Sequence, residues 1–295
     1  MSLPRISIVT PSYNQAGFLE ETIRSVVEQD YPNLEYVVID GGSSDGSVEI
    51  IKQYESKIAY WESAPDDGHG HAINKGFAKT SGEIMAWINS DDKYTPWAFQ
   101  VVADVFSKFP HVNWVVGFNG YWNSQGAMIN AFRHPKNIYD LLVGNEGWIQ
   151  QESVFWRRSL WETAGGSINQ DFRLMVDGEL WTRFFLHDEL YALDCVLGGY
   201  RIHTENRAIH NHNECLREME VAIAAMREKC PEQTLRIAKK LRRLKSAKKT
   251  WGMRHFPMQY LVSKYVWPDL YRTLRYKNLV FRDGEWREGT LPWSI

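Results

Sequence analysis

The stretch RISIVTPSYNQAGFLEETIRSVVEQDYPNLEYVVIDGGSSDGSVEII, residues 5–51, decides the fold. It opens with a β-rich run, Arg5–Thr10, that ends at a proline. Apolar residues then recur at helical spacing across Phe18–Glu28, and a second apolar run, Leu34–Asp40, closes at Gly41-Gly42. A strand, a helix and a strand at this spacing predict a βαβ unit with parallel strands.

The same alternation continues along the chain. We predict further strands at Ile58–Glu62, Glu83–Ile88 and Trp114–Phe118, and helices from an Asp45 cap through Tyr54, over Gly70–Lys79 and over Pro96–Phe109. Beyond residue 118 we predict a hairpin at Tyr121–Phe132, three further short strands at Ser153–Trp156, Tyr191–Asp194 and Gly199–His203, and a helix over Asp177–His187. The predicted fold class is α/β, with a mostly parallel central sheet and helices on both faces.

Charge is distributed unevenly along the 295 residues, although the formal net charge is only −2. Residues 1–206 carry 15 basic and 27 acidic side chains, whereas residues 207–282 carry 18 basic and 6 acidic ones. Residues 214–249 are rich in helix formers, with a narrow apolar seam of Leu235, Ala238, Leu241 and Leu244. We therefore expect an α/β domain over 1–206 and a basic, mainly helical extension over 207–295.

Three cysteines, Cys195, Cys215 and Cys230, form no CxxC pair, which argues against a disulfide framework and a zinc site. The first residues lack the basic and apolar pattern of a signal peptide, and there is no run of about 18 apolar residues. These features favour a cytoplasmic protein. No nucleic-acid-binding module is visible, so nucleic acid is not an expected partner.

Polar residues follow three of the predicted strands, in the segments Thr10–Asn14, Asp40–Asp45 and Asn89–Asp92. Ends of parallel strands meet at one edge of a sheet, where ligands of open α/β folds bind. Asp91 and Asp92 either bind Mg²⁺ or Mn²⁺ with a diphosphate or cap the helix that follows. The glycine-rich turn after Asp40 either holds a nucleoside or is an ordinary βα turn. Neither a P-loop nor a dinucleotide GxGxxG motif is present.

The opening stretch, together with INKGFAKTSGEIMAWINSDD at residues 73–92, resembles the family 2 glycosyltransferases, which have the GT-A fold. The resemblance extends from about Ile6 to about Arg207 and leaves the basic extension outside. It implies an inverting hexosyl transfer from a nucleotide-diphosphate sugar, a UDP-sugar first, assisted by Mg²⁺ or Mn²⁺. Residues 1–118 would form the nucleotide-sugar half, and residues 119–206 the acceptor half. The acceptor would be a hydroxyl of a glycan or a lipid-linked sugar, in surface polysaccharide biosynthesis.

The resemblance also implies roles for individual residues. Nucleotide-sugar binding falls to Pro11, Tyr13, Asp40, Asp45, Asp67, Asn74, Lys75 and Asp91, metal binding to Asp91 and His203, and general base catalysis to Asp177. Two positions depart from the family pattern. Asn89 replaces the first acid of the DxD motif, which removes one charge from the metal site, and Val176 precedes Asp177 where many relatives have Glu.

Several alternatives stay open at the level of sequence. The alternatives to a glycosyltransferase are a nucleotidyltransferase and an inactive module that binds sugar nucleotides or glycans. The alternative to catalysis for Asp177 is a role as a helix N-cap. Trp148 and Trp181 either stack on a sugar or pack in the core. His69 and His71 either contact the diphosphate or lie in a solvated loop, and the loop is the expectation. The basic extension either contacts the inner face of an anionic membrane or folds against the acidic body.

Overall fold

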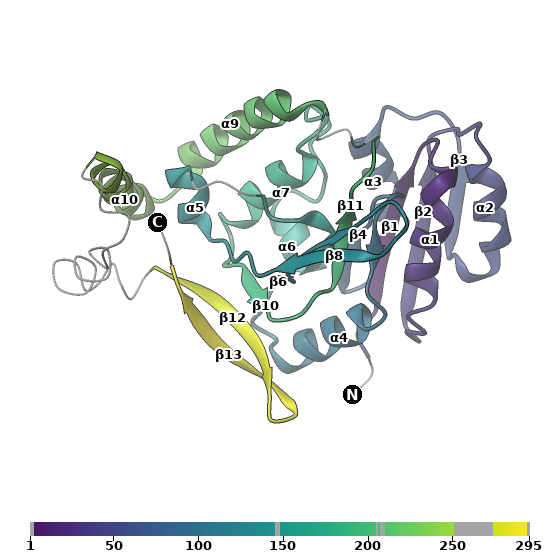
Figure 1. Cartoon of the computed structure of the whole chain (residues 1–295), viewed down its shortest axis with the longest axis horizontal. Helices are drawn as coiled ribbons and strands as arrows, with labels where there is room; N and C mark the ends of the chain where they lie inside the picture. The colour runs from purple at the N-terminus through teal and green to yellow at the C-terminus, as the bar shows by residue number, and fades with distance from the viewer. Residues whose placement is uncertain (1–2, 145–147, 205, 207–209, 251–273, 294–295) are drawn as a thin grey trace.

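The computed structural model describes residues 3–144, 148–204, 206, 210–250 and 274–293. Its centre is a nine-stranded sheet in the order β13-β12-β10-β6-β9-β4-β1-β2-β3 (Figure 1). The first part of the chain alternates between strands and helices, as predicted. These elements are β1 (Ile6–Ser12), α1 (Ala16–Val27), β2 (Leu34–Asp40), α2 (Ser47–Gln53), β3 (Tyr60–Ser63), α3 (His69–Phe77), β4 (Ile84–Trp87) and α4 (Ala98–Lys108).

The remaining elements complete the sheet and cover it. They are β6 (Trp114–Val116), α5 (Ile138–Val143), the short 3-10 turn η2 (Gln151–Ser153), β9 (Val154–Arg157), α6 (Arg158–Thr163), α7 (Val176–Phe184) and β10 (Tyr191–Leu193). A second sheet has the order β5-β11-β7-β8, from β5 (Lys93–Tyr94), β7 (Asn119–Trp122), β8 (Met128–Phe132) and β11 (Gly198–Arg201). The hairpin predicted over Tyr121–Phe132 is β7 and β8, which pair antiparallel.

The central sheet is mostly parallel, as predicted. β1 lies between β2 and β4 and is parallel to both, and β6, β10 and β12 are also parallel. β9 runs antiparallel between β4 and β6. Because Ser12 pairs with Asp40, β1 and β2 end level with each other, and their following loops lie at one edge of the sheet.

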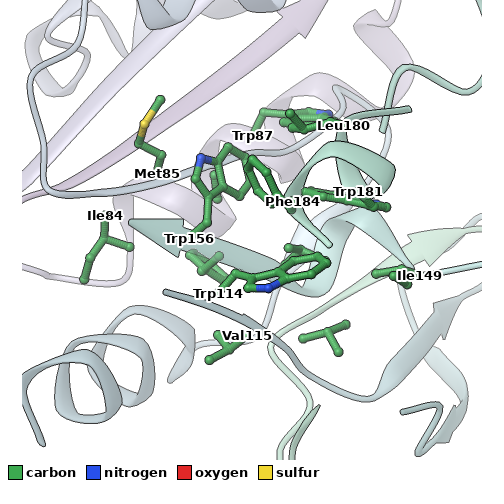
Figure 2. Close-up of a cluster of buried hydrophobic side chains, with 14 of the residues drawn as sticks. Ile84, Met85, Trp87, Trp114, Val115, Ile149, Trp156, Leu180, Trp181 and Phe184 are labelled. Carbon is green, nitrogen blue, oxygen red and sulfur yellow. The ribbon is translucent and has the colours of Figure 1, made fainter. Parts of the chain in front are cut away.

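Helices cover both faces of the sheet, and β9 shows this in two successive residues. Phe155 packs on Phe99 of α4, whereas Trp156 packs against the helices on the opposite face. On that face Trp156 joins a buried aromatic cluster that includes Trp87, Trp114, Trp181 and Phe184 (Figure 2). Trp181 is 2% exposed and stacks on Trp87 at 5.8 Å, so it is a core residue.

A glycine brings α3 close to β1. A Cβ on Gly76 would overlap a methyl group of Val9, so only glycine fits where the helix crosses this strand. The close approach fixes α3 on the sheet. Its N-terminus, which begins at His69, then lies near the ends of β1 and β4.

The C-terminal part differs from the expected mainly helical extension. The predicted single helical stretch over 214–249 is two helices, α9 (His212–Lys229) and α10 (Glu232–Thr250), which Pro231 separates. The structure then forms a hairpin of β12 (Arg275–Arg282) and β13 (Glu285–Pro292) that joins the central sheet through β10 (Figure 1). Asp283 and Gly284 both have positive φ at its turn, the conformation that an Asp-Gly pair favours.

The two C-terminal helices lie against the body of the protein. α9 contacts α7, and α10 contacts α5. Within α10 Ala238 and Leu241 are buried, which confirms the apolar seam at these two positions. Several of the aromatic residues that follow Trp251 in the sequence fall outside the described residues. Among the helices that the structure describes, none has both the length and the apolar character needed to cross a bilayer.

Candidate active site

A cavity of about 550 Å³ opens at the carboxyl ends of β1, β2 and β4, where the sequence predicted a ligand site. Its walls come from the loops after these strands, from the start of α3, from β11 and from the segment before α7. The lining residues are Pro11, Ser12, Tyr13, Gln15, Gly41, Pro65, Asp66, Gly68, His69, Ala72, Asn89, Ser90, Asp91, Arg173, Leu174, Tyr200 and Asn206. Tyr13 is 62% exposed, so its ring is available to a ligand entering the cavity.

Asp91 and His203 meet at the wall of this cavity. The Oδ2 atom of Asp91 lies 3.0 Å from Nε2 of His203, whose ring packs on Phe18. Among the residues that the structure describes, no three His, Cys, Asp or Glu side chains gather in a metal-binding group. A cation at this point would therefore have one carboxylate and one imidazole from the protein, and further oxygen ligands would come from a diphosphate and water.

The segment Asn89–Asp92 is held rigidly from two sides. The Thr22 hydroxyl of α1 donates to the carbonyl oxygens of Ser90 and Asp92, at 2.9 and 2.7 Å. From β11, Nε of Arg201 donates to the carbonyl oxygen of Asp91 at 2.6 Å. The cap of α4 is Trp97 without a side-chain hydrogen bond, so neither Asp91 nor Asp92 caps that helix.

The side chain of Asn89, at the position of the first DxD acid, is engaged by neighbours. Its Oδ1 lies 3.0 Å from Nε2 of His69, and its amide nitrogen donates to Oδ2 of Asp92 at 3.2 Å. The expectation that His69 sits in a solvated loop was wrong, because the start of α3 brings it into the cavity wall. His71 instead accepts a hydrogen bond from the backbone of Asp67.

A buried pair of carboxyl groups lies behind the cavity. Asp92 and Glu152 hydrogen-bond each other, and Asp92 also accepts the backbone N–H of Arg201 at 2.7 Å. Burial, together with the nearby carboxylates, raises the pKa of Asp92 well above its usual range and that of Glu152 to about 7. Both groups therefore keep their protons to higher pH than exposed carboxyl groups do. The charges of Asp177 and Asp91 contribute to the raised pKa of Glu152.

The turn after β2 is organised by its two acids. Asp40 is fully buried and accepts hydrogen bonds from the backbone of Gly42 and Ser43 and from the hydroxyls of Ser43 and Ser63. Asp45 accepts from the backbone of Ala16 and Ser47, which joins the starts of α1 and α2. Neither acid lines the cavity. Both fix the loop that carries Gly41 into its wall.

Three residues implied by the resemblance are engaged outside the cavity lining. Asp67 has an 87% exposed side chain near His71, while its neighbour Asp66 faces the cavity. Lys75 forms an ion pair with Glu62. The Asn74 side chain exchanges two hydrogen bonds with the backbone of Ile168, at 2.9 and 2.7 Å, and so ties α3 to the chain leading into α7.

Asp177 lies in the first turn of α7 and is not among the residues that line the main cavity. It borders a small apolar pocket together with Leu141, Trp148, Ile149, Met175, Gly178, Trp181 and Met219. Burial raises its pKa to about 6. Met175 holds the N-cap position of α7 without a side-chain cap, so Asp177 is not the cap. An acid with this pKa is ionised at neutral pH and can accept a proton.

Sequence reasoning missed Arg173, Asp66 and Tyr200 as cavity residues. Arg173 lies in the segment before α7, more than eighty residues after the DxD position, and it places a cation at the cavity that also contains Asp91. Periodicity carries no information about such a contact. The pair Asp66-Asp67 did signal a polar loop, but only the folded turn decides which acid faces inward.

The comparisons with known proteins agree with this geometry. The model of the family described as "Glycosyl transferase family 2" matches residues 7–163. An uncharacterized glycosyltransferase of Mycobacterium tuberculosis is 31% identical over 199 residues, covering 66% of this chain and 74% of that protein. TuaG of Bacillus subtilis, named as a teichuronic acid biosynthesis glycosyltransferase, is 35% identical over 96 residues, covering 31% and 37%.

Solved structures share the fold at low sequence identity. Residues 1–349 of Staphylococcus aureus TarS, in complex with UDP-GlcNAc, superpose with a TM-score of 0.62 at 18% identity, over 90% of this chain and 79% of that one. The mannosyltransferase PcManGT of Pyrobaculum calidifontis, in complex with GDP-Man and Mn²⁺, gives 0.56 at 19% identity, over 92% and 82%. The fold and the cavity thus define a glycosyltransferase of the GT-A class. The chain belongs to glycosyl transferase family 2.

Proposed function

We propose that this protein transfers a hexose from a nucleotide-diphosphate sugar, a UDP-sugar first, to a hydroxyl of a glycan or lipid-linked acceptor, with inversion at the anomeric carbon. The proposal rests on one observation: two carboxyl groups, those of Asp91 and Asp177, line two different pockets. Asp91 lines the main cavity beside His203, whereas Asp177 borders a second, small pocket and has a pKa of about 6. A diphosphate site and a separate base are the two requirements of a direct displacement.

The proposed reaction is a single displacement. The acceptor oxygen forms a bond to the anomeric carbon while the bond from that carbon to the diphosphate oxygen breaks, and the electron pair leaves on the diphosphate. The carboxylate of Asp177 takes the proton of the acceptor hydroxyl. A base without an enzyme nucleophile inverts the configuration, as in inverting glycoside hydrolysis.

Asp91 and His203 would hold Mg²⁺ or Mn²⁺ together with the donor diphosphate. Their donor atoms lie 3.0 Å apart at the cavity wall, and a carboxylate oxygen with an imidazole nitrogen suits such an ion. A bound divalent ion would add positive charge beside the leaving group. Pro11 and Tyr13 would line the base and ribose, and Asp40 and Asp45 would support that loop from behind.

A panel of nucleotide sugars tests the donor. Thermal stabilisation and hydrolysis are measured for UDP-, GDP- and dTDP-sugars with Mn²⁺, with Mg²⁺ and with a chelator. We expect stabilisation by one nucleotide class, stronger with metal. The proposal fails if no nucleotide sugar stabilises the protein in either metal. The structure of TarS contains UDP-GlcNAc and that of PcManGT contains GDP-Man with Mn²⁺, which supports including both nucleotides.

Surface polysaccharide biosynthesis is the proposed setting. TuaG, similar over part of its length, is named for teichuronic acid biosynthesis. Acceptors of such reactions are often carried on lipids, and α10 presents the exposed cations Lys239, Lys240, Arg242 and Arg243. Its described acid, Glu232, is engaged by Arg236. We propose peripheral contact of this helix with the inner face of an anionic membrane, at about 1 kcal/mol per cation near the surface.

Vesicle binding tests the membrane contact. Binding to anionic vesicles is expected to fall with salt, and the variant with Lys239, Lys240, Arg242 and Arg243 all changed to Glu is expected to lose it. In a control variant, the exposed residues Lys52 and Lys57, which lie outside α10, are changed to Glu. This variant is expected to bind as the natural chain does. Equal binding by both variants would contradict a membrane role for α10.

A further inference from the structure

One carboxylate of α9 holds the chain that enters α7. Glu218 accepts the backbone N–H of Arg173 on Oε1 at 3.0 Å, and those of Leu174 and Met175 on Oε2 at 3.0 and 2.8 Å. Hydrogen bonds to an ionised acceptor are the stronger kind, and three successive ones fix both the position and the direction of this segment. We call residues 173–175 the clamped segment.

The clamped segment borders two spaces at once. Arg173 and Leu174 line the main cavity, and Met175 lines the small pocket that contains Asp177. Asp177 follows only two residues later, in the first turn of α7. A shift of this segment would therefore displace the cation at the cavity and the carboxylate at the pocket together.

α9 packs tightly enough on α7 to keep Glu218 in place. Cys215 and Met219, which flank Glu218 on the same helix, are buried against Met175. A Cβ on Gly178 would overlap the sulfur of Met219, so the two helices meet at a glycine. The three N–H groups belong to the N-cap residue of α7 and to the two residues before it, so a different helix, and not the local sequence, fixes the chain that enters α7.

We propose that Glu218 is a positioning residue of the transfer reaction: it fixes the clamped segment so that Arg173 meets the donor diphosphate and Asp177 meets the acceptor hydroxyl. The inference rests on the proposed function for its catalytic part. Glu218 lies in the region beyond residues 7–163, which the family model matches, so the C-terminal region completes the site rather than merely following it.

The charge of Glu218 supplies a measurable signature. Burial is the main cause of the raised pKa of Asp177, and the carboxylate of Glu218 raises it further. The charge of Asp177 in turn raises the pKa of Glu152 of η2 and that of Cys215 of α9, while the backbone N–H of Gly178 stabilises the ionised form of Asp177. Removing the charge of Glu218 should therefore ease ionisation of Asp177 and move the acidic limb of the rate profile to lower pH.

Three variants of the full chain test the inference. Glu218→Ala removes the acceptor, Glu218→Gln keeps one acceptor oxygen without the charge, and Glu220→Gln removes a charge from an exposed position of the same helix. We measure amide hydrogen exchange of residues 173–175, kcat and KM for donor and acceptor, the pH profile and the melting temperature.

For Glu218→Ala we expect faster exchange of these three amides and a loss of about tenfold or more in kcat, because three hydrogen bonds to an ionised acceptor are removed. Glu218→Gln should retain more activity and show an acidic limb at lower pH, and Glu220→Gln should match the natural chain throughout. If Glu218→Ala does not fold, the pH profile and exchange of Glu218→Gln decide.

Unchanged exchange at 173–175, or a variant that loses melting temperature but keeps kcat and the pH profile, would overturn the inference. If the natural chain transfers no sugar from any donor, the proposed function fails. In that case the exchange experiment still shows whether the clamp exists.

Discussion

The carboxylate of Asp91 and the imidazole of His203 lie 3.0 Å apart, although 112 residues separate them in the chain. The loop after β4 supplies the first, and the chain that follows β11 supplies the second. Their meeting joins the strand-end site predicted from the first ninety residues to the second, smaller sheet. The proposed diphosphate site is therefore a junction between the two sheets.

Asp91→Ala should weaken binding of the nucleotide sugar and of Mn²⁺ together, each by about tenfold or more, since one charged ligand is lost. Titration calorimetry with each ligand, alone and in the presence of the other, checks this. Asp104→Ala is the matched control, because this residue is exposed on α4 and outside the cavity lining. Equal losses in the two variants would contradict the assignment of Asp91.

The rate of transfer should fall as the pH drops through about 6. Burial raises the pKa of Asp177 to about 6, and a general base works only in its ionised form. The profile of kcat/KM against pH should therefore have an acidic limb near this value, well above the usual range of an aspartate. A rate that stays flat between pH 5 and pH 8 would rule out Asp177 as the titrating base.

The stability of the folded protein should fall as the pH rises, because of the buried pair Asp92 and Glu152. The pKa of Glu152 is about 7 in the folded protein, above its unfolded value of 4.5, so the folded state holds the extra proton between these limits. This contribution to stability is complete below pH 4.5 and is lost as the pH rises through 7. Compared with Glu152→Gln, the natural chain should lose more melting temperature between pH 5.5 and pH 8. Parallel curves for the two proteins would argue against a raised pKa of Glu152.

The aromatic cluster should dominate the stability of the α7 face. Trp156 is fully buried among Trp87, Trp181 and Phe184, so Trp156→Ala should cost about 3–5 kcal/mol of the free energy of unfolding. Trp97→Ala, at a side chain that is 49% exposed, should cost clearly less. Denaturant unfolding measures both, and similar losses would show that the cluster is not the centre of the core.

Local sequence predicted the first half of the fold well, because the spacing of apolar residues and the turn residues between them mark its strands and helices. The strand expected at Leu34–Asp40 has these bounds in the structure, and the ends of β1, β2 and β4 meet as parallel pairing requires. The hairpin at Arg275–Pro292 was missed although its turn signal, Asp283-Gly284, was present. Charged and apolar residues are mixed along both strands, so the alternation of residue types that marks a strand is weak there.

The site was predicted less completely, for a physical reason. Residues at strand ends can be placed from the chain alone, which is why Pro11, Tyr13 and Asp91 were expected and do line the cavity. Arg173 and Glu218 depend on how α7 and α9 dock, and that contact is encoded in buried shape rather than in spacing. Trp181 shows the same limit, since only packing separates a core tryptophan from a sugar-stacking one.

Asp177→Asn tests the central claim most directly. The amide keeps the size of the side chain and cannot accept the acceptor proton, so transfer should fall by about 10²–10⁴-fold. Binding of the donor, measured by calorimetry on the same sample, should stay within about twofold of the natural chain, because Asp177 lies outside the donor cavity. Transfer at the natural rate, or a loss of donor binding that accounts for the whole loss of transfer, would contradict Asp177 as the base.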